Sequence, residues 1–389
     1  MTASAAPPSI TVTRFPCFDG LRAIAASTIV VFHVASTEGA TTASGYGRYL
    51  ARLDVGVAVF FVVSGFLLYR PFVVAHLGGR PVSRWRAFWW RRIVRIYPAY
   101  WVALTVAIVG FHNTHLHGFV DYVRHYALLQ IYRPHFGLDG IVQTWTLAIE
   151  VSFYAALPLY AGLVGRFTAR APRARALAIE LSAVALLYIA GLAVRAAIFS
   201  AHGTSAPATR WLPAQLDLFA LGIGLAVVSG AGGEGVPDAI VRPLQWLGDH
   251  ALASWTVAAV AFATVCNIGL PTTFANGTHS EELARQVLYG FTAFFLVVPA
   301  VFGSQDRGAV RRLLRSRPAV AVGIVSYGVF LWHFDWIKQL VDFGLLRNVS
   351  ELRFLVLLVL TALLTTATAT LSWFFVERPV LARKGWPAR

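Results

Sequence analysis

Long apolar stretches dominate this sequence and limit what it can fold into. A membrane-spanning helix needs about 20 mostly apolar residues. Ten stretches near that length can be recognised, over residues 18–36, 54–73, 94–111, 141–165, 176–199, 213–229, 250–269, 286–303, 319–341 and 354–376. The sequence therefore predicts an all-α, polytopic membrane bundle of about ten transmembrane helices.

The composition agrees with a membrane protein. Apolar residues make up 57% of the 389 residues and charged residues only 13%, against about 25% charged in soluble domains. This balance argues against a soluble enzyme, a disordered chain or a secreted disulfide scaffold. We expect a disordered tail over residues 1–13, one transmembrane domain over 14–380 and a short basic tail over 381–389.

Basic residues are distributed unevenly between the segments that join the apolar stretches. The net charge of +15 could indicate a nucleic-acid-binding protein. If the N-terminus is inside, however, 22 basic residues fall in inside segments and 8 in outside segments, as expected when basic loops stay in the cytoplasm. The sequence thus predicts an N-in, C-in protein of the cell membrane, whose partners include the lipid bilayer and no nucleic acid.

The first apolar stretch has a second interpretation, as a signal peptide cleaved after Ala35 and Ser36. This stretch also carries Asp19, Arg22 and His33, which a removable leader does not need. An ionisable side chain at mid-membrane costs about 2.5–3.5 kcal/mol and is a functional candidate for that reason. On a helix, Arg22 and His33 share one face and lie about 16.5 Å apart along the axis, which favours function over two independent structural roles.

Two further arginines lie where a basic loop enters the third stretch. Arg92 and Arg95 are three residues apart and share a helix face. Guanidinium groups bind phosphate oxygens through paired hydrogen bonds. The pair is therefore a candidate anion site, with a simple positive-inside anchor as the alternative.

A carboxylate and a second histidine are expected in the same half of the membrane as His33. Glu150 lies about a third of the way into the fourth stretch from the outside, and His333 lies past the middle of the ninth. A carboxylate near an imidazole can orient a general base, although a structural pair is the alternative. Further ionisable residues within spans include Arg195, Asp217, Asp335 and Lys338.

Metal binding is a weaker hypothesis. The two cysteines, Cys17 and Cys266, support neither a disulfide framework nor a zinc site. The outer loop over 112–140 is rich in histidine but has no companion shell rich in carboxylates, with only Asp121 and Asp139 in it. We therefore expect no metal at this group, which consists of His112, His115, His117, His125 and His135.

Seven short motifs occur in order along the chain. They cover residues 18–23 with 32–33, 56–67, 92–98, 145–150 with 153–154, 217–222, 326–333 and 377–379. The first includes an Arg-x10-His spacing and the third an Arg-x-x-Arg spacing. In these motifs, over about residues 15–380, the chain resembles the acyltransferase-3 family of integral membrane proteins. That family moves acyl groups onto sugars, antibiotics and envelope polymers.

The resemblance implies a membrane O-acyltransferase with acyl-CoA as its co-substrate and no bound cofactor or metal. Arg92 and Arg95 would hold the phosphates of cytoplasmic acyl-CoA, with Arg22 also on the donor path. The acyl group would pass to a hydroxyl-bearing acceptor, namely a carbohydrate, a glycolipid or an antibiotic-type molecule.

The resemblance also implies a catalytic group made of His33, Glu150 and His333. His33 would deprotonate the acceptor hydroxyl or carry the acyl group transiently. Glu150 and His333 would orient the base or the acceptor. Supporting positions would be Asp19, Ser64, Trp145, Asp217 and Tyr327.

The chain departs from the family pattern in two residues and in length. Thr146 stands where the family usually has Ser, and Phe330 where Tyr or another bulky residue is common. Some members carry an additional C-terminal esterase-like SGNH domain, for which the sequence after the last stretch leaves no room. Transfer would be completed by the membrane domain itself or by a separate extracytoplasmic partner.

Other classes of protein remain as alternatives. A transporter or flippase of an anionic or lipid-linked substrate would also bury Arg, His and Glu, but usually has internal repeats, which are not visible here. Soluble acyltransferases use His-x4-Asp, and no histidine in this chain has Asp five residues later. Other membrane-bound O-acyltransferases share an intramembrane His. A non-enzymatic scaffold would not need such costly buried charges.

Overall fold

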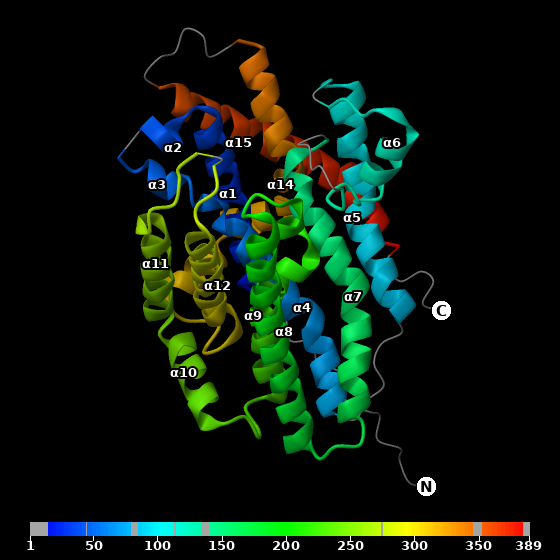
Figure 1. Cartoon of the computed structure of the whole chain (residues 1–389), viewed down its shortest axis with the longest axis vertical. Helices are drawn as coiled ribbons and strands as arrows, with labels where there is room; N and C mark the ends of the chain where they lie inside the picture. The colour runs from blue at the N-terminus through cyan, green and yellow to red at the C-terminus, as the bar shows by residue number, and fades with distance from the viewer. Residues whose placement is uncertain are drawn as a thin grey trace.

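The structure is a computed structural model that describes residues 15–43, 45–78, 85–112, 114–133, 140–273, 275–344 and 352–383. All regular elements within these ranges are helical, and most of the long helices stand side by side along one axis (Figure 1). The prediction of an all-α membrane bundle is confirmed. The predicted tail over 1–13 and most of the tail over 381–389 lie outside the described residues.

Nine predicted stretches correspond to single long helices. They are α1 (Phe18–Thr37), α4 (Gly56–Leu77), α5 (Trp85–Val109), α7 (Trp145–Thr168), α8 (Arg173–His202), α9 (Leu216–Ala231), α12 (His279–Val301), α14 (Arg317–Asp342) and α15 (Arg353–Ser372). Together with short adjoining turns, these nine are long and apolar enough to cross a membrane, counted over the described residues.

Shorter elements connect the long helices. The α-helices are α2 (Ala40–Ala43), α3 (Gly47–Leu50), α6 (Gly118–Tyr126), α10 (Asp238–Asp249), α11 (Ala251–Asn267), α13 (Ala309–Leu314) and α16 (Arg378–Leu381). Short 3₁₀ turns cover Leu53–Val55, Val142–Thr144, Pro207–Arg210 and Leu212–Gln215, and a π-helical turn covers Trp373–Glu377.

The one remaining predicted stretch, 250–269, corresponds to α11, which is bent by 100° from α10. The neighbouring helices show that this pair must cross the bundle. Gln286 near the start of α12 donates hydrogen bonds to both carboxylate oxygens of Asp217 at the start of α9, at 2.9 and 3.0 Å. Because α9 and α12 begin on the same side, the chain between them has to return through α10 and α11. The bent pair therefore counts as one crossing.

Contacts between α1 and α14 support the same count. Gly323 packs against the backbone of Asp19 near the starts of these helices, where a Cβ atom would lie 2.0 Å from the Asp19 oxygen. Further along both helices, the ring nitrogens of His33 and His333 are 3.0 Å apart. The two helices therefore run parallel, as the first and ninth of ten crossings do. It follows that α1 begins, and α15 ends, on one side of the bundle. The positive-inside bias predicts that this side is cytoplasmic.

Helix α4 lies at the centre of the bundle because two glycines let α9 approach it closely. A Cβ atom at Gly222 would lie 2.0 Å from the carbonyl oxygen of Val62, and one at Gly65 would lie 2.4 Å from that of Phe219. Small residues allow such backbone contact between membrane helices. The Phe219 ring also stacks on Phe61 of α4, with 4.6 Å between centroids. This packing fixes the face of α4 that carries the site.

One buried arginine outside the spans fastens the chain between α12 and α14. Arg311 of α13 is 2% exposed and donates to the backbone oxygens of Gly248, Pro299 and Phe302 at 2.5, 3.1 and 2.8 Å. Burial lowers the pKa of this guanidinium. Its hydrogen bonds hold the end of α10 and the end of α12 against α13.

Candidate functional site

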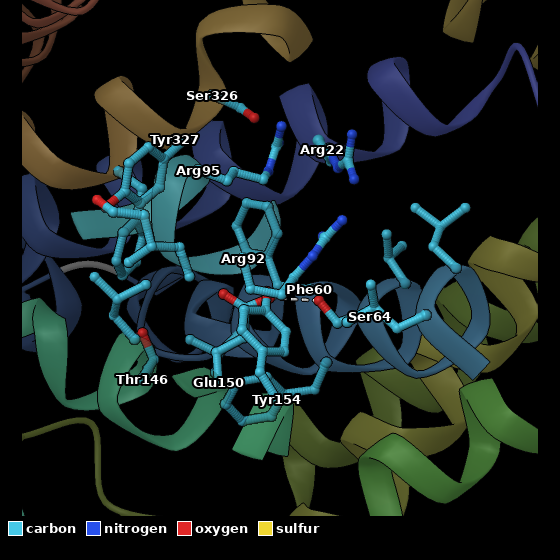
Figure 2. Close-up of a pocket in the computed structure, with 18 residues that line it drawn as sticks. Arg22, Phe60, Ser64, Arg92, Arg95, Thr146, Glu150, Tyr154, Ser326 and Tyr327 are labelled. Atoms are coloured by element: carbon cyan, nitrogen blue, oxygen red, sulfur yellow. Dashed lines mark hydrogen bonds between the residues drawn. The ribbon is translucent and has the colours of Figure 1, made fainter. Parts of the chain in front are cut away.

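A cavity of about 280 Å³ lies between α1, α4, α5, α7 and α14 (Figure 2). Along α4 its lining runs from Val57 to Leu68, which is about 16 Å of helix. The cavity extends from Arg22, four residues into α1, to Val57, one residue into α4. Since α1 and α4 begin on opposite sides, these residues mark its two ends. The polar lining consists of Arg22, Ser64, Arg92, Arg95, Thr146, Glu150, Tyr154, Ser326 and Tyr327.

Three arginines gather at the end of the cavity where α1 begins. Arg92 and Arg95 lie on one face of α5, and Figure 2 shows them around the same space as Arg22 of α1. Arg22 is 3.5 Å from Asp19. The Nε atom of Arg92 is buried and has no hydrogen-bond partner among the described residues. Positive charge therefore exceeds negative charge here, which suits an anionic ligand such as a phosphate.

Glu150 lies close to these arginines in the cavity. It lies five residues into α7 and accepts a hydrogen bond of 2.5 Å from the hydroxyl of Ser64 on α4 (Figure 2). The charges of Arg22 and Arg92 interact electrostatically with its carboxylate. Glu150 is expected from the sequence to lie near an imidazole, but the described contacts include none between Glu150 and either histidine. Its relation to the base stays a prediction.

His33 and His333 form a hydrogen-bonded pair whose neutral tautomers follow from their neighbours. Nδ1 of His333 lies 2.8 Å from the carbonyl oxygen of Phe330 and 3.2 Å from that of Val329. Since a carbonyl only accepts, this nitrogen carries the proton and Nε2 of His333 is an acceptor. Nδ1 of His33, 3.0 Å away, therefore donates to it. Nε2 of His33 is left with a free lone pair, as a base or a nucleophile requires.

The imidazole pair lies beyond the wall of the cavity. Neither His33 nor His333 lines it, whereas Phe330, one turn before His333 on α14, does. The Phe330 ring is 6.0 Å from the His333 ring and 6.2 Å from the Phe60 ring, centroid to centroid. The structure thus brings His33 and His333 together outside the cavity lining, where the His333 ring contacts Phe330 of the cavity wall.

The supporting positions divide into two groups. Ser64 and Tyr327 line the cavity, and the Tyr327 hydroxyl donates to the backbone oxygen of Ile96 at 2.8 Å. Trp145 and Asp217 do not line it. The Arg210 guanidinium lies over the Trp145 ring at 5.9 Å, and Asp217 accepts from Gln286. These two residues therefore connect helices away from the cavity.

Sequence reasoning overlooks two features. Tyr154 lines the cavity one turn after Glu150, and the i, i+4 spacing would have indicated a shared face. Glu180 falls within the predicted span 176–199 and is fully buried. It accepts a hydrogen bond from the Tyr69 hydroxyl at 2.7 Å and pairs with Nδ1 of His76 at 2.6 Å. This group links α4 to α8.

The histidine-rich outer loop is only partly described. Among the residues with described positions, no three His, Cys, Asp or Glu side chains are placed to hold a metal ion. His125 bonds instead to the backbone oxygen of Asp121, with 2.8 Å between Nδ1 and the oxygen. His135 lies outside the described residues.

Comparison with known proteins identifies similar sequences over nearly the whole chain. A family model described as an acyltransferase domain matches residues 15–377. A Bacillus subtilis protein provisionally named peptidoglycan O-acetyltransferase YrhL is 27% identical over 94% of this chain and 54% of its own length. O-acetyltransferase OatA of Staphylococcus aureus is 23% identical over 96% of this chain and 58% of its own length.

A third relative is of more similar length. Acyltransferase MdmB of Streptomyces mycarofaciens is 25% identical over 84% of this chain and 80% of its own length. By contrast, the chain spans little more than half the length of YrhL and OatA. No solved structure matches the chain.

Proposed function

Because the chain belongs to the acyltransferase-3 family of membrane proteins, we propose that it moves an acyl group from cytoplasmic acyl-CoA to a hydroxyl of a carbohydrate, glycolipid or antibiotic-type acceptor. It would act in the cell membrane, with acyl-CoA as co-substrate and without a bound cofactor. The observation that carries the proposal is a cavity with three arginines at one end and an imidazole pair just beyond the other.

The donor fits this arrangement by its own chemistry. Acyl-CoA carries phosphates at one end and a thioester at the far end of a long pantetheine arm. Phosphates at Arg22, Arg92 and Arg95 would direct that arm along α4 toward Phe60. The unpartnered Nε of Arg92 supports this assignment, since a buried donor without an acceptor costs about 1–3 kcal/mol. A phosphate oxygen would satisfy it.

The imidazole pair supplies the acid–base chemistry. Nε2 of His33 takes the proton of the acceptor hydroxyl while the hydroxyl oxygen attacks the thioester carbonyl carbon. The new C–O bond forms, the C–S bond breaks, and the departing thiolate receives the proton from His33. The alternative is attack by Nε2 itself, with transient acylation of His33. Both routes need the same lone pair, which His333 keeps available as a positioning residue.

The acceptor assignment rests on the relatives. YrhL and OatA are named for O-acetyl transfer, in the first case to peptidoglycan, which supports a carbohydrate hydroxyl. The imidazole pair lies toward the side where α4 begins, which the charge bias predicts to be outside. Transfer would therefore be completed at the outer face, by this domain or through a separate extracytoplasmic partner.

Binding of CoA to the detergent-solubilised protein tests the donor site. Arg92→Ala and Arg95→Ala each remove charge-assisted hydrogen bonds worth about 1.5–3 kcal/mol, so affinity for CoA should fall about ten- to a hundredfold. The control is Arg86→Ala, which removes an exposed arginine that lies on the same helix and outside the cavity lining. Equal CoA affinity in all four proteins would overturn the donor site.

A further inference from the structure

The Phe330 ring lies between the cavity and the imidazole pair, and the Phe60 ring packs against it. Phe60 and Phe330 both line the cavity, from α4 and α14 respectively, and their ring centroids are 6.2 Å apart. The Phe330 ring is also 6.0 Å from the His333 ring. We call these two residues the aromatic partition. A group that moves along the cavity from the arginines meets the partition before it reaches an imidazole.

The surroundings of the partition are apolar. Val57 and Phe61 line the cavity next to Phe60. Phe330 is 8% exposed, so this ring is closely surrounded, whereas Phe60 is only partly buried. The charged lining residues lie at the other end or beside Ser64. The end of the cavity that faces the histidines is therefore suited to a hydrocarbon group and not to a charged one.

An acyl group that moves from the cavity to His33 has to pass the Phe330 ring. The Phe330 ring centroid is 6.0 Å from that of His333, which is 5.0 Å from that of His33. An acetyl group adds only one methyl group to the thioester carbonyl that makes this passage. A longer chain has to displace a ring, and displacing a closely packed ring costs energy.

We infer that Phe60 and Phe330 determine acyl-chain length and restrict the donor to short acyl groups, acetyl above all. The inference rests on the proposed function and refines it, because transfer from acyl-CoA leaves the chain length open. The rings act by steric exclusion. Each additional methylene that a tight apolar site excludes changes relative turnover by about 10- to 200-fold.

The test compares acyl donors in native membranes that contain the protein. Incorporation of radiolabel is measured from acetyl-, butanoyl- and hexanoyl-CoA, with membranes lacking the protein as background. The wild type should use acetyl-CoA far better than butanoyl-CoA. Phe330→Ala and Phe60→Ala should raise the butanoyl-to-acetyl ratio at least tenfold. Phe330→Leu, which preserves more packing, should raise it by less.

The matched control is Phe334→Ala. The Phe334 ring lies 5.0 Å from the His33 ring but does not line the cavity. A general loosening around the histidines would therefore affect Phe334→Ala as strongly as Phe330→Ala, whereas a partition predicts an unchanged ratio in the control.

Different results would overturn the role of the aromatic partition and the proposed acyl transfer. Acetyl transfer by the wild type with an unchanged ratio in Phe60→Ala, Phe330→Ala and Phe330→Leu overturns the partition and leaves the proposed function intact. An equal rise of the ratio in Phe334→Ala also overturns it. Absence of transfer from all three donors by the wild type overturns the proposed function, and the inference falls with it.

Discussion

Replacing His333 with Phe tests the hydrogen bond that orients the base. In the wild type, Nδ1–H of His33 donates to Nε2 of His333 at 3.0 Å and approaches the backbone oxygen of Ile29 at 3.1 Å. His333→Phe removes the first acceptor but keeps an aromatic ring of similar size in a fully buried position. The backbone contact with Ile29 stays, so His33 keeps one partner.

The size of the effect follows from the change in charge on His33. With neutral His33, the lost hydrogen bond is worth about 0.5–1.5 kcal/mol; with His33 protonated in the transition state, it is worth about 1.5–3 kcal/mol. Only the difference, about 1–1.5 kcal/mol, slows the chemical step. Turnover should therefore fall about five- to twelvefold. His33→Ala removes the lone pair itself and should cost about a hundredfold or more.

The assay follows radiolabel from acetyl-CoA into native membranes and, separately, CoA affinity in detergent. Affinity should be unchanged in His333→Phe, since His333 does not line the cavity. His333→Gln offers an amide oxygen as a substitute acceptor and should retain more turnover than His333→Phe. Wild-type turnover in His333→Phe would refute the positioning role. A loss as large as that of His33→Ala would refute it too, because His333 would then take part in the chemistry.

Three further predictions concern charge, packing and anchoring. Glu150→Gln removes charged hydrogen bonds worth about 1.5–3 kcal/mol and should therefore lower turnover about tenfold or more. CoA binding should not become weaker. Weaker CoA binding would contradict the position of Glu150 beside the arginines. Gly222→Ala forces a methyl group against the backbone of α4 and should destabilise the fold by about 1–3 kcal/mol. Its thermal midpoint should be lower than that of the control Gly224→Ala, whose methyl group meets only a side chain at 3.4 Å. Arg311→Ala removes the donor to the backbone oxygens of Gly248, Pro299 and Phe302. Since a buried acceptor left unsatisfied costs about 1–3 kcal/mol, the thermal midpoint should fall, whereas Ala at the exposed neighbour Arg312 should be tolerated. Equal midpoints for Arg311→Ala and Arg312→Ala would exclude the anchoring role.

Hydropathy suffices to predict the long helices because each must cover the same apolar thickness. It does not predict the bend between α10 and α11. A window over 250–269 records apolar content, not direction, so it gives no warning of the 100° angle. Whether α10 and α11 together make one crossing of the bundle becomes clear only from tertiary contacts such as that between Gln286 and Asp217.

The sequence predicts how deep each candidate residue lies in the membrane, but it does not predict which side chains are in contact. Helical periodicity correctly places Arg22 and His33 on one face of α1, yet Arg22 lines the cavity and His33 lies behind Phe330. Depth alone puts Glu150 level with the histidines. Which helix faces which, and hence that His33 meets His333 while Glu150 meets Ser64, depends on close packing such as the glycine contacts between α4 and α9. A single sequence carries no direct signal of that packing.

The contact between His33 and His333 joins residues 300 positions apart, and this separation bears on how the protein is made. The first helix enters the membrane long before the ninth has been synthesised. At about 5–20 residues per second, translation takes roughly 15–60 s to cover that interval. Throughout it, His33 is already embedded without the imidazole that orients it. The imidazole pair can therefore form only when α14 inserts beside α1, which makes its assembly one late step of biogenesis.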